Sequence, residues 1–470
     1  MNRKILFLPI VVFFFLCGCT MAPKYTRPDA PVPADWPTGP AYKEAKQETS
    51  APAAAELPWR DFITDTRLQE VIETALTNNR DLRVAALNVE LAKAMYGIGT
   101  ATLLPSVNAI GSWYKERVPA DLSSSGSAYT TEKYSVNLGI TSWEIDFFGR
   151  IRSLKDKALE EYLATDQALR SSQILLVSTV AQAYLAMAAD RETLQLVSKT
   201  LEAQESAYGL IRKRYDVGIA SELDLRRAQS QVDTARGDVA RYTQRVAQDE
   251  NALNLLVGSP LEQELLPADL GSVSPPREVS ASLSSEVLLR RPDVLAAEHR
   301  LKATNANIGA ARAAFFPRIA LTTAIGTASA DLSGLFKAGS GVWSFAPQII
   351  MPIFDARTWF AYDVIKIEKE MSIAQYEKAI QTAFREVADA LAVKGTVNQQ
   401  IAAQQSLVDA VAETYRLSQL RYTKGIDGYL SVLDSQRSLY GAEQGLIALR
   451  LARFNNLITL YKTLGGGQDK

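Results

Sequence analysis

Apolar residues recur along this chain with two different periods. Between residues 66 and 102, and again from about Arg150 to Arg214, they return at every third or fourth position, which predicts helices. At 1.5 Å per residue, the second of these helices would be on the order of 95 Å long. Few compact domains need such a rod. Proline is absent between Pro119 and Pro260 and again after Pro352, which favours uninterrupted helices in both regions.

Four shorter segments alternate apolar with small or polar residues, which predicts strands of roughly ten to thirteen residues. The segments span about 104–117, 132–147, 317–329 and 341–353. They carry aromatic residues near their ends, as membrane β-barrel strands do. The aromatic residues expected at the membrane interface are Trp113, Trp143 and Trp343. The alternative is a small soluble antiparallel sheet, and Pro347 argues mildly against a central position for the last strand.

Four strands cannot close a barrel, and lipid does not tolerate an open sheet edge. Several copies of the chain are therefore expected to share one barrel. After the signal peptide, no segment is expected to be apolar enough for a spanning helix, so the shared strands should make any passage through a membrane. The predicted fold class is mainly α, with long antiparallel helices and a membrane β-barrel portion.

The two predicted return helices carry a seam of apolar and small residues that steps by three and four. The seam positions are Leu225, Ala228, Val232, Ala235, Val239, Tyr242 and Val246 in the first helix, and Val432, Ser435, Leu439, Ala442, Leu446 and Leu449 in the second. Such a heptad seam is typical of a coiled coil whose small residues let helices approach closely. An ordinary antiparallel coiled coil, with the two halves paired, is the simpler interpretation.

The chain contains one organisation twice. Arg214-Tyr215-Asp216-Val217-Gly218-Ile219 returns 207 residues later as Arg421-Tyr422-Thr423-Lys424-Gly425-Ile426, and further landmarks keep an offset of 207 to 212 residues. Each copy resembles a helix end, a tight turn at glycine and a new helix start. Ser221 followed by Asp224 resembles a helix cap. The sequence therefore predicts two equivalent helical hairpins.

The duplication and the strand pattern together predict the domain organisation. The predicted segments are the first repeat at 61–258 with long helices at about 150–257, a connector at 259–275, the second repeat at 276–465 with long helices at about 355–464, and a tail at 466–470. Each repeat contains two of the four strands.

The N-terminus has the pattern of a targeting segment. Residues 1–18 have a basic start and a short apolar run, and Leu16-Cys17-Gly18-Cys19 resembles a bacterial lipobox. This implies that Cys19 becomes the acylated first residue, and Thr20 suits lipoproteins sent to the outer membrane. Ordinary secretory cleavage is the alternative. The proline-rich stretch 19–60 reads as a strap along a surface or as disorder.

Composition excludes several classes of function. The chain has 470 residues and a net charge of −1, which gives no reason to expect a nucleic-acid partner. Both cysteines lie in the first nineteen residues, and His299, expected on a packed or surface helix face, is the single histidine. Disulfide frameworks, histidine-based metal sites and histidine-based triads are therefore unsupported. No enzyme activity and no cofactor are expected beyond the lipid on Cys19.

These features together resemble the TolC and OprM type of outer membrane factors, in the lipoprotein branch that serves RND multidrug efflux pumps. The resemblance covers nearly the whole mature chain. It rests on the lipobox cysteine and on Trp143-Glu144-Ile145-Asp146-Phe147-Phe148-Gly149-Arg150, Arg290-Arg291-Pro292-Asp293, Ala306-Asn307-Ile308-Gly309-Ala310-Ala311 and Leu464-Gly465-Gly466-Gly467. It implies a homotrimer with one twelve-stranded barrel and a periplasmic helical tunnel, or α-barrel, in a Gram-negative outer membrane. It also implies a periplasmic adaptor (membrane fusion protein) and a proton-driven, RND-type inner-membrane pump as partners.

The resemblance also implies positions for a gate and for adaptor contacts. Leu430 and Asp434 match constriction-ring positions, and Tyr422 and Arg437 match gate-restraining positions. Ser431 stands where TolC has a second acidic ring, and a solvated helix face is the alternative for Asp434. The residues expected to contact adaptor tips are Arg214, Tyr215, Gly218, Arg421, Tyr422 and Gly425.

The function predicted from the sequence is a passive exit duct for drugs and other small molecules. A metal-ion duct or a type I protein-secretion duct is the alternative within the class. A lipid-anchored coiled-coil scaffold without a lumen is the alternative of another class. Substrates are expected to be selected by the pump and its adaptor.

Overall fold

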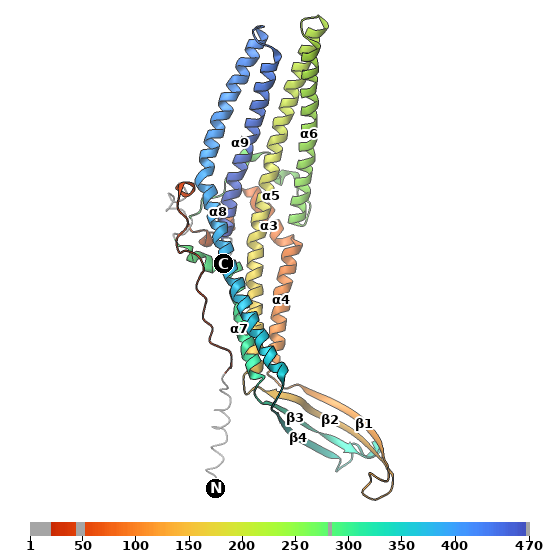
Figure 1. Ribbon diagram of the computed structural model, residues 1–470. Helices are drawn as coiled ribbons and strands as arrows, with labels where there is room; N and C mark the ends of the chain where they lie inside the picture. Colours follow the sequence, from red (N-terminus) through yellow and green to blue (C-terminus); the bar gives the residue numbers. More distant parts are fainter. Residues whose placement is uncertain (1–19, 44–51, 281–283, 467–470) are drawn as a thin grey trace. The chain divides into compact units, whose positions relative to one another are not determined.

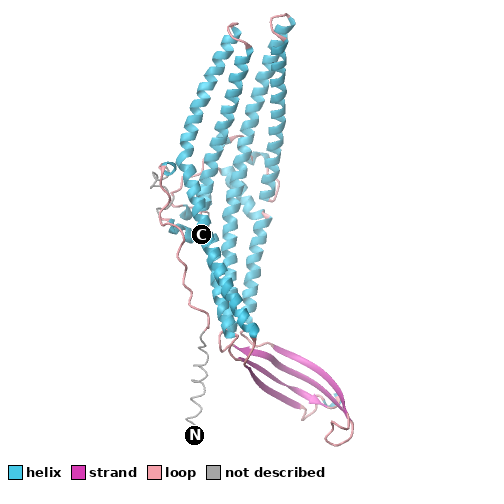
Figure 2. Cartoon of the chain, in the orientation of Figure 1, coloured by secondary structure: helices cyan, strands magenta, loops and turns pink. Residues whose placement is uncertain are grey.

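The computed structural model describes residues 20–43, 52–280 and 284–466, and consists of helices and one sheet (Figure 2). The predicted acylation residue, Cys19, lies outside the described residues. The chain forms two compact units. The first contains the residues up to Asp29 together with Asn88–Asp166 and Ala296–Tyr376, and the second contains Ala30–Leu87, Gln167–Leu295 and the chain from Glu377 onward.

The sheet belongs to the first unit and is antiparallel throughout. Its strands are β1 (Val107–Val118), β2 (Tyr129–Ile145), β3 (Arg318–Ser329) and β4 (Gly341–Ile350), joined in the order β1-β2-β3-β4 (Figure 1). Compared with the sequence expectation, β2 begins at Tyr129 rather than 132, and β4 ends at Ile350 rather than 353. Within the described residues, neither β1 nor β4 pairs with a further strand on its outer side.

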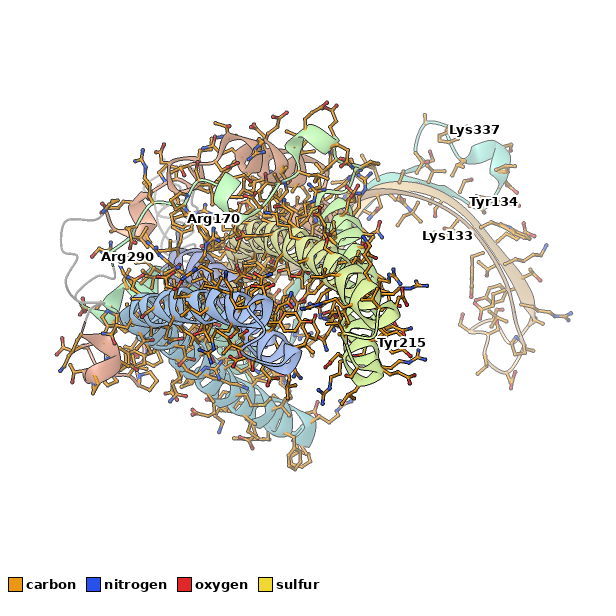
Figure 3. All side chains as sticks on the ribbon, turned by 90° about the horizontal axis from the view of Figure 1, so that it is seen from above. Lys133, Tyr134, Arg170, Tyr215, Arg290 and Lys337 are labelled. Carbon is orange, nitrogen blue, oxygen red and sulfur yellow. The ribbon has the colours of Figure 1, made fainter. Side chains whose placement is uncertain are left out.

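The edge position of β4 explains how the sheet accommodates Pro347. This proline lies opposite Leu321 of β3 in the register. Proline cannot donate a hydrogen bond to a ladder and is therefore tolerated on edge strands. The sheet is curved (Figure 3), and β2 carries an irregularity between Ile140 and Trp143 where Ser142 has a positive φ of 54°. Such an extra residue bends a strand.

Two helices occupy the region in which one continuous helix was expected. α3 (Thr66–Asn78) and α4 (Arg80–Ala101) are separated at Asn79, whose ψ of 129° is extended. The Asn79 side chain accepts from the Leu82 backbone N–H at 2.8 Å, which caps α4. Its amide group donates to the Leu256 carbonyl at 2.8 Å, far away in the sequence. A local helix cap and a tertiary contact therefore meet at the residue where the helix breaks.

The second repeat makes the equivalent contact with a different side chain. Arg291 precedes α7 (Pro292–Ala313) and donates through Nη1 to the Thr463 carbonyl at 2.7 Å. Leu256 and Thr463 are 207 residues apart, the offset of the sequence repeat. Both carbonyls lie at the C-terminal end of a return helix, where intrahelical partners are lacking. In each repeat, a carbonyl at the end of the return helix (α6 or α9) therefore accepts a hydrogen bond from the residue just before the repeat's shorter helix (α4 or α7).

Four long helices form the two hairpins. These are α5 (Arg150–Asp216) with α6 (Glu222–Val257) and α8 (Ala356–Thr423) with α9 (Tyr429–Thr463). In the second unit, α6 runs alongside the upper part of α5, and α9 runs alongside the upper part of α8 (Figure 1). Seam residues Ala228, Val232 and Ala235 of α6 and Val432 and Ala442 of α9 are buried, as the heptad pattern predicts. The seam therefore supplies the hairpin core.

Short elements pack beside the helices of the second unit. They are α2 (Trp59–Phe62) and the 3₁₀ turns η1 (Pro40–Tyr42), η3 (Ala54–Glu56), η4 (Gln263–Leu265), η5 (Leu270–Ser272) and η6 (Ser285–Arg290), while η7 (Leu332–Gly334) belongs to the first unit. Phe62 stacks on Tyr461 of α9 with ring centroids 3.9 Å apart. The Tyr461 hydroxyl donates to the Leu57 carbonyl at 2.7 Å. These contacts fix the N-terminal segment to the core of this unit.

One expectation about apolar segments is wrong. Among the described residues, α5 alone contains a stretch that is long and apolar enough to cross a membrane by length and composition. Of that stretch, 61% is buried inside the chain. Val180, Tyr184 and Leu185 are among the fully buried residues of α5. The apolar stretch is therefore explained by burial in the core of the second unit.

Candidate functional site: hairpin tips and predicted gate

Both hairpin tips close with the same backbone geometry. Gly218 N donates to Tyr215 O at 2.8 Å, and Gly425 N donates to Tyr422 O at 3.0 Å. The glycines have φ values of 75° and 72°, in the left-handed region that other residues avoid. The predicted helix–glycine turn–helix tips are confirmed in both copies.

The two tips differ in how the following helix begins. Ser221 accepts from the Asp224 N–H at 3.1 Å, which confirms the predicted cap of α6. α9 begins after Gly428, which offers no side-chain cap. The second tip is instead closed by Arg421, which binds the Asp427 carboxylate at 2.5 and 3.0 Å. Sequence reasoning named Arg421 as an adaptor contact and missed this ion pair, although both charges lie beside the same glycine.

Apolar side chains are exposed around the tips. Val217 and Ile219 flank Gly218, and Ile426 follows Gly425, each with well over half of its surface exposed. Tyr215 lies at the end of the α5–α6 hairpin (Figure 3). Exposed apolar groups gathered at one place are typical of an interaction surface. The predicted adaptor contacts did not include these three aliphatic residues, although Ile219 and Ile426 occupy equivalent positions directly after the two tip glycines.

The tips pack against each other through aromatic rings. The Arg214 guanidinium lies 5.2 Å from the centre of the Tyr422 ring, and Tyr422 is 5.3 Å from Tyr429 between centroids. Tyr429 packs with Ile211 in a buried cluster. Burial raises the pKa of Tyr429 to about 12, with smaller effects from neighbouring tyrosines. Two predicted tip residues, Arg214 and Tyr422, are thus brought together from opposite hairpins.

The structure brings together two of the four predicted gate residues. Arg437 donates to the Asp434 carboxylate at 2.7 Å within α9, and both side chains are largely exposed. Leu430 is exposed on the same helix. Tyr422 lies in the aromatic contact with Arg214, so its ring has a partner inside the chain. The Asp434 charge is therefore partly balanced by its own neighbour.

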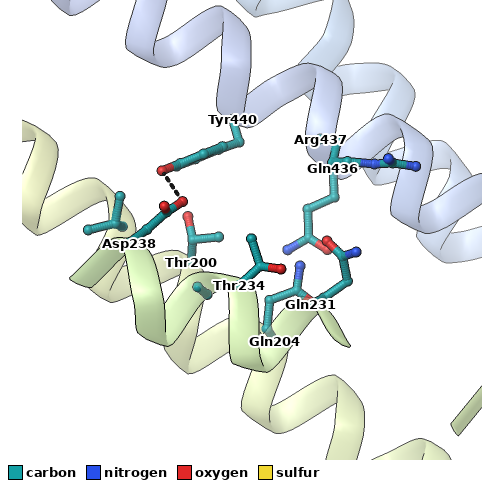
Figure 4. A pocket seen from close by; sticks show the side chains of 10 residues that line it. Thr200, Gln204, Gln231, Thr234, Asp238, Gln436, Arg437 and Tyr440 are labelled. Carbon is teal, nitrogen blue, oxygen red and sulfur yellow. Dashed lines mark hydrogen bonds between the residues drawn. The ribbon is translucent and has the colours of Figure 1, made fainter. Parts of the chain in front are cut away.

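A pocket of about 320 Å³ lies between α5, α6 and α9 below the tips (Figure 4). Tyr440 of α9 donates to the Asp238 carboxylate of α6 at 3.1 Å and so joins the two hairpins. Burial and the Asp238 charge raise the pKa of Tyr440. Arg437 and the buried Gln204 also line this pocket. Sequence reasoning missed the Tyr440–Asp238 bond because neither residue belongs to a motif.

The three predicted interface tryptophans all lie in or beside the sheet. Trp113 and Trp343 are exposed on β1 and β4. Trp143 on β2 donates from its indole nitrogen to the Leu103 carbonyl at 3.2 Å. An aromatic ring with a polar handle suits a position between apolar and aqueous surroundings.

No group of three His, Cys, Asp or Glu side chains that could hold a metal ion occurs among the described residues. His299 Nδ1 lies 2.6 Å from Glu160 Oε2 and packs between α7 and α5. The single histidine therefore pairs with a carboxylate of a neighbouring helix.

Long helical hairpins with exposed apolar tips, together with a sheet whose two edges have no partner in the described chain, define the class of outer-membrane channel protomers. The chain belongs to the outer membrane efflux protein family, whose profile matches residues 71–259 and 283–466. The two matched ranges each contain one hairpin and two strands.

Named relatives and solved structures agree with this family. The antibiotic efflux pump outer membrane protein ArpC of Pseudomonas putida is 47% identical over 99% of this chain and 96% of its own length. The toluene efflux pump outer membrane protein TtgF of the same species is 48% identical over 98% and 97%. The open-state structure of the Neisseria gonorrhoeae MtrE outer membrane channel has a TM-score of 0.85 and 38% identity, covering 96% of this chain and 98% of its own.

Proposed function

We propose that three copies of this chain assemble into a passive exit duct of a tripartite efflux pump. The observation that carries the proposal is the open sheet: the described chain leaves the outer sides of β1 and β4 unpaired. In lipid, each unpaired backbone group costs several kcal/mol, so such edges must be closed. Pairing β1 of one protomer with β4 of the next closes a barrel with four strands from each copy.

The lipobox supports a second anchor in the outer membrane. Acylation of Cys19 would add a diacylglycerol and an amide-linked chain, and two or more chains give stable anchoring. The described strap begins at Thr20 and follows α7 of the first unit through contacts with Glu298 and Asn305. A strap fixed in this way would hold the lipidated residue beside that unit.

The exposed tips support docking of a periplasmic adaptor. Both tips end in a left-handed glycine flanked by an exposed aliphatic residue. Arg214 adds positive charge at the base of the first tip, whereas the charge of Arg421 at the second tip is balanced by Asp427. An adaptor with complementary small apolar and acidic groups fits this surface. The adaptor would connect the duct to an RND-type pump in the inner membrane.

The residues of α9 below the second tip support a gate. In a trimer, Leu430 and Asp434 would form one apolar and one acidic ring around the axis. Because each Asp434 is paired with its own Arg437, the acidic ring would attract cations less than three isolated carboxylates do. Opening requires the α8–α9 hairpin to move away from α5–α6, and the Tyr440–Asp238 bond opposes this movement.

Relatives named for antibiotic and toluene efflux support small organic molecules as substrates. The charged residues Asp238 and Arg437 in the pocket below the tips are already bound within the chain, to Tyr440 and Asp434. Selection by the pump, with unselective passage through the duct, fits this arrangement.

The test combines oligomeric mass in detergent with conductance in a planar bilayer. Purified protein is expected to have about three times the chain mass of 51.5 kDa and to conduct ions. A monomer without conductance would instead favour the lipid-anchored scaffold. Drug, copper and silver susceptibility of a deletion strain separates a drug duct from a metal-ion duct.

A further inference from the structure

An aromatic groove lies where the described chain begins. Within the first unit, Thr20 and Met21 of the strap line one side of the groove, and Phe315, Trp359 and Tyr362 line the other. Its volume is about 590 Å³, within the range of about 300–1,000 Å³ typical of small-molecule sites. The Trp359 ring meets the Phe315 ring edge-on at 4.8 Å, yet 63% of Trp359 is exposed. The groove therefore presents a preformed apolar wall.

The strap reaches this groove in a fixed register on α7. Three α7 residues spaced by seven positions lie on one face of the helix, and each of them binds the strap. The contacts are Glu298 with Arg27 at 2.7 Å, Asn305 with the Pro23 carbonyl at 2.8 Å and Arg312 with the Met21 carbonyl at 3.3 Å. Glu298 is 3% exposed in its side chain. Because the partners are buried or backbone groups, the strap cannot slide without breaking several bonds.

A glycine lets the strap lie against the helix backbone. A Cβ added at Gly309 of α7 would lie 2.4 Å from Ser153 Oγ of α5, 2.7 Å from the Ala22 nitrogen and 2.9 Å from the Ala22 Cα. Any larger residue would push against the strap and against Ser153, whose hydroxyl is itself 3.2 Å from the Thr20 hydroxyl of the strap. The repeat-equivalent position in the first half is Gly97, where no described atom lies within 4 Å of an added Cβ. The two glycines therefore form a matched pair, one against the strap and one in open space.

Three side chains that build the groove in the second repeat have no equivalent in the first repeat. The positions equivalent to Arg312, Phe316 and Trp359 in the first repeat hold Thr100, Leu104 and Ile151. The cation that binds the strap and the aromatic rings at its end are thus absent from the half that carries no strap. The aromatic wall and the strap occur in the same repeat, which indicates that they act together.

We propose that this groove seats an acyl chain carried by Cys19, an inference that rests on the proposed lipidation. Thr20 lines the groove, and one peptide bond joins Cys19 to Thr20, so an acyl chain on Cys19 would be tethered close to the groove. A chain attached there has an effective concentration of about millimolar or more. A free phospholipid chain lacks this advantage. Filling the groove covers the exposed aromatic wall and holds the lipid in register with α7.

The test uses a fatty acid with a diazirine in its chain. Cells are fed this probe, the trimer is purified, irradiated and digested, and crosslinked peptides are identified by mass spectrometry. Crosslinks are expected in the peptides that contain residues 312–316 and 356–362. The mass of the N-terminal peptide measures acylation of Cys19 separately. Acylated protein with crosslinks confined to the strands would overturn the groove and leave lipidation standing, whereas an unmodified Cys19 would overturn both.

Two variants and a control identify the source of the chain. Gly309→Ala should displace the strap and lower the crosslink yield in these peptides about tenfold, because the tether no longer directs the chain into the groove. Gly97→Ala should leave the yield unchanged. Cys19→Ala, exported through a non-lipoprotein signal peptide, should abolish these crosslinks. Their persistence would mean that a membrane phospholipid fills the groove and would refute the proposal.

Discussion

Arg291 shows how a single side chain ties distant helices together. It is 7% exposed, and its guanidinium binds the Thr463 carbonyl, Asp293 and Glu386 at 2.7 to 3.0 Å. A buried cation is favourable only when all its donors are paired, and removing it leaves the partners unsatisfied. Arg291 therefore acts as a junction of η6, α7, α8 and α9.

Replacing Arg291 with Leu should reduce the free energy of unfolding by about 3–5 kcal/mol, because Glu386 and the Thr463 carbonyl lose their partner. The exposed neighbour Arg290 is the matched control, and Arg290→Leu should change stability by less than about 0.5 kcal/mol. Thermal and urea unfolding of the solubilised protein measure both. Equal effects of the two substitutions would contradict the role of Arg291.

Asp249 of α6 should make stability depend on pH. Burial, followed by the charge of Asp190 on α5 and a hydrogen bond to it, raises the pKa of Asp249 to about 6. A carboxyl whose pKa is raised on folding destabilises the folded state once it ionises. Stability is therefore expected to fall as the pH rises from about 4 to above 6. Asp249→Asn should stabilise by about 1–2 kcal/mol at pH 7.5, allowing for partial exposure, and have little effect at pH 4. Melting temperatures at the two pH values test this, and the same gain at both would refute it.

At the scale of elements, each hairpin depends on its turn. Gly218 and Gly425 adopt the same left-handed conformation 207 residues apart, and the helices on either side are otherwise uninterrupted. A β-branched residue is strained there, because its Cβ clashes with the neighbouring backbone. The turns also hold the exposed aliphatic residues in place. A change at either glycine should therefore affect docking more than assembly.

Gly218→Val and Gly425→Val should each cost about 1–2 kcal/mol locally, leave the trimer intact and reduce drug resistance and adaptor co-purification. Gly237→Ala is the control, because Gly237 lies inside α6 with no described atom near an added Cβ. It should leave docking unchanged and slightly favour the helix. Full resistance in both valine variants would exclude a docking role for the tips.

The Tyr440–Asp238 bond should resist separation of the hairpins. Tyr440→Phe keeps the ring and removes the hydroxyl, and a hydrogen bond to a charged group contributes about 1.5–3 kcal/mol. Asp238 keeps Arg241 as a partner at 2.8 Å, so the variant should still fold. Single-channel recordings should show more frequent opening than in the wild type. An unchanged open probability would exclude this bond as a gate restraint.

At the scale of the whole molecule, the sheet of one chain has two open edges in the described residues. Lipid offers no hydrogen bonds to such edges, so in the proposed trimer the neighbouring copies would pair with them. The duplicated helices suit this proposed closure, because equivalent hairpins would alternate around the axis of the trimer.

Cysteine pairs on β1 and β4 should reveal the assembly. The native cysteines are Cys17 and Cys19, so residues introduced in the sheet form clean reporters. A scan that combines positions 109–115 with positions 342–349 should yield disulfide-linked oligomers at matching registers. Combinations of β2 with β4 should not, since β3 separates these strands. Bonds formed only within one chain would contradict shared closure.

The sequence by itself determined the local structure and the repeat. Heptad spacing predicted the helices, alternation predicted the strands, and glycine marked both turns, because backbone sterics and side-chain periodicity act over a few residues. The repetition of the tip motif 207 residues later marked it as a structural feature of both hairpins. The strand ends differed by a few residues, since the last pairs of a ladder depend on the neighbouring strand.

Only the tertiary structure decided how these elements are completed. Asn79 caps α4 locally and also binds the Leu256 carbonyl, 177 residues away, and no local pattern contains that second contact. The pairing of Tyr440 with Asp238 likewise depends on how the hairpins pack. The apolar stretch of α5 is a core segment because neighbouring elements bury it. Long-range contacts depend on which surfaces meet in space, and periodicity along the chain does not encode that.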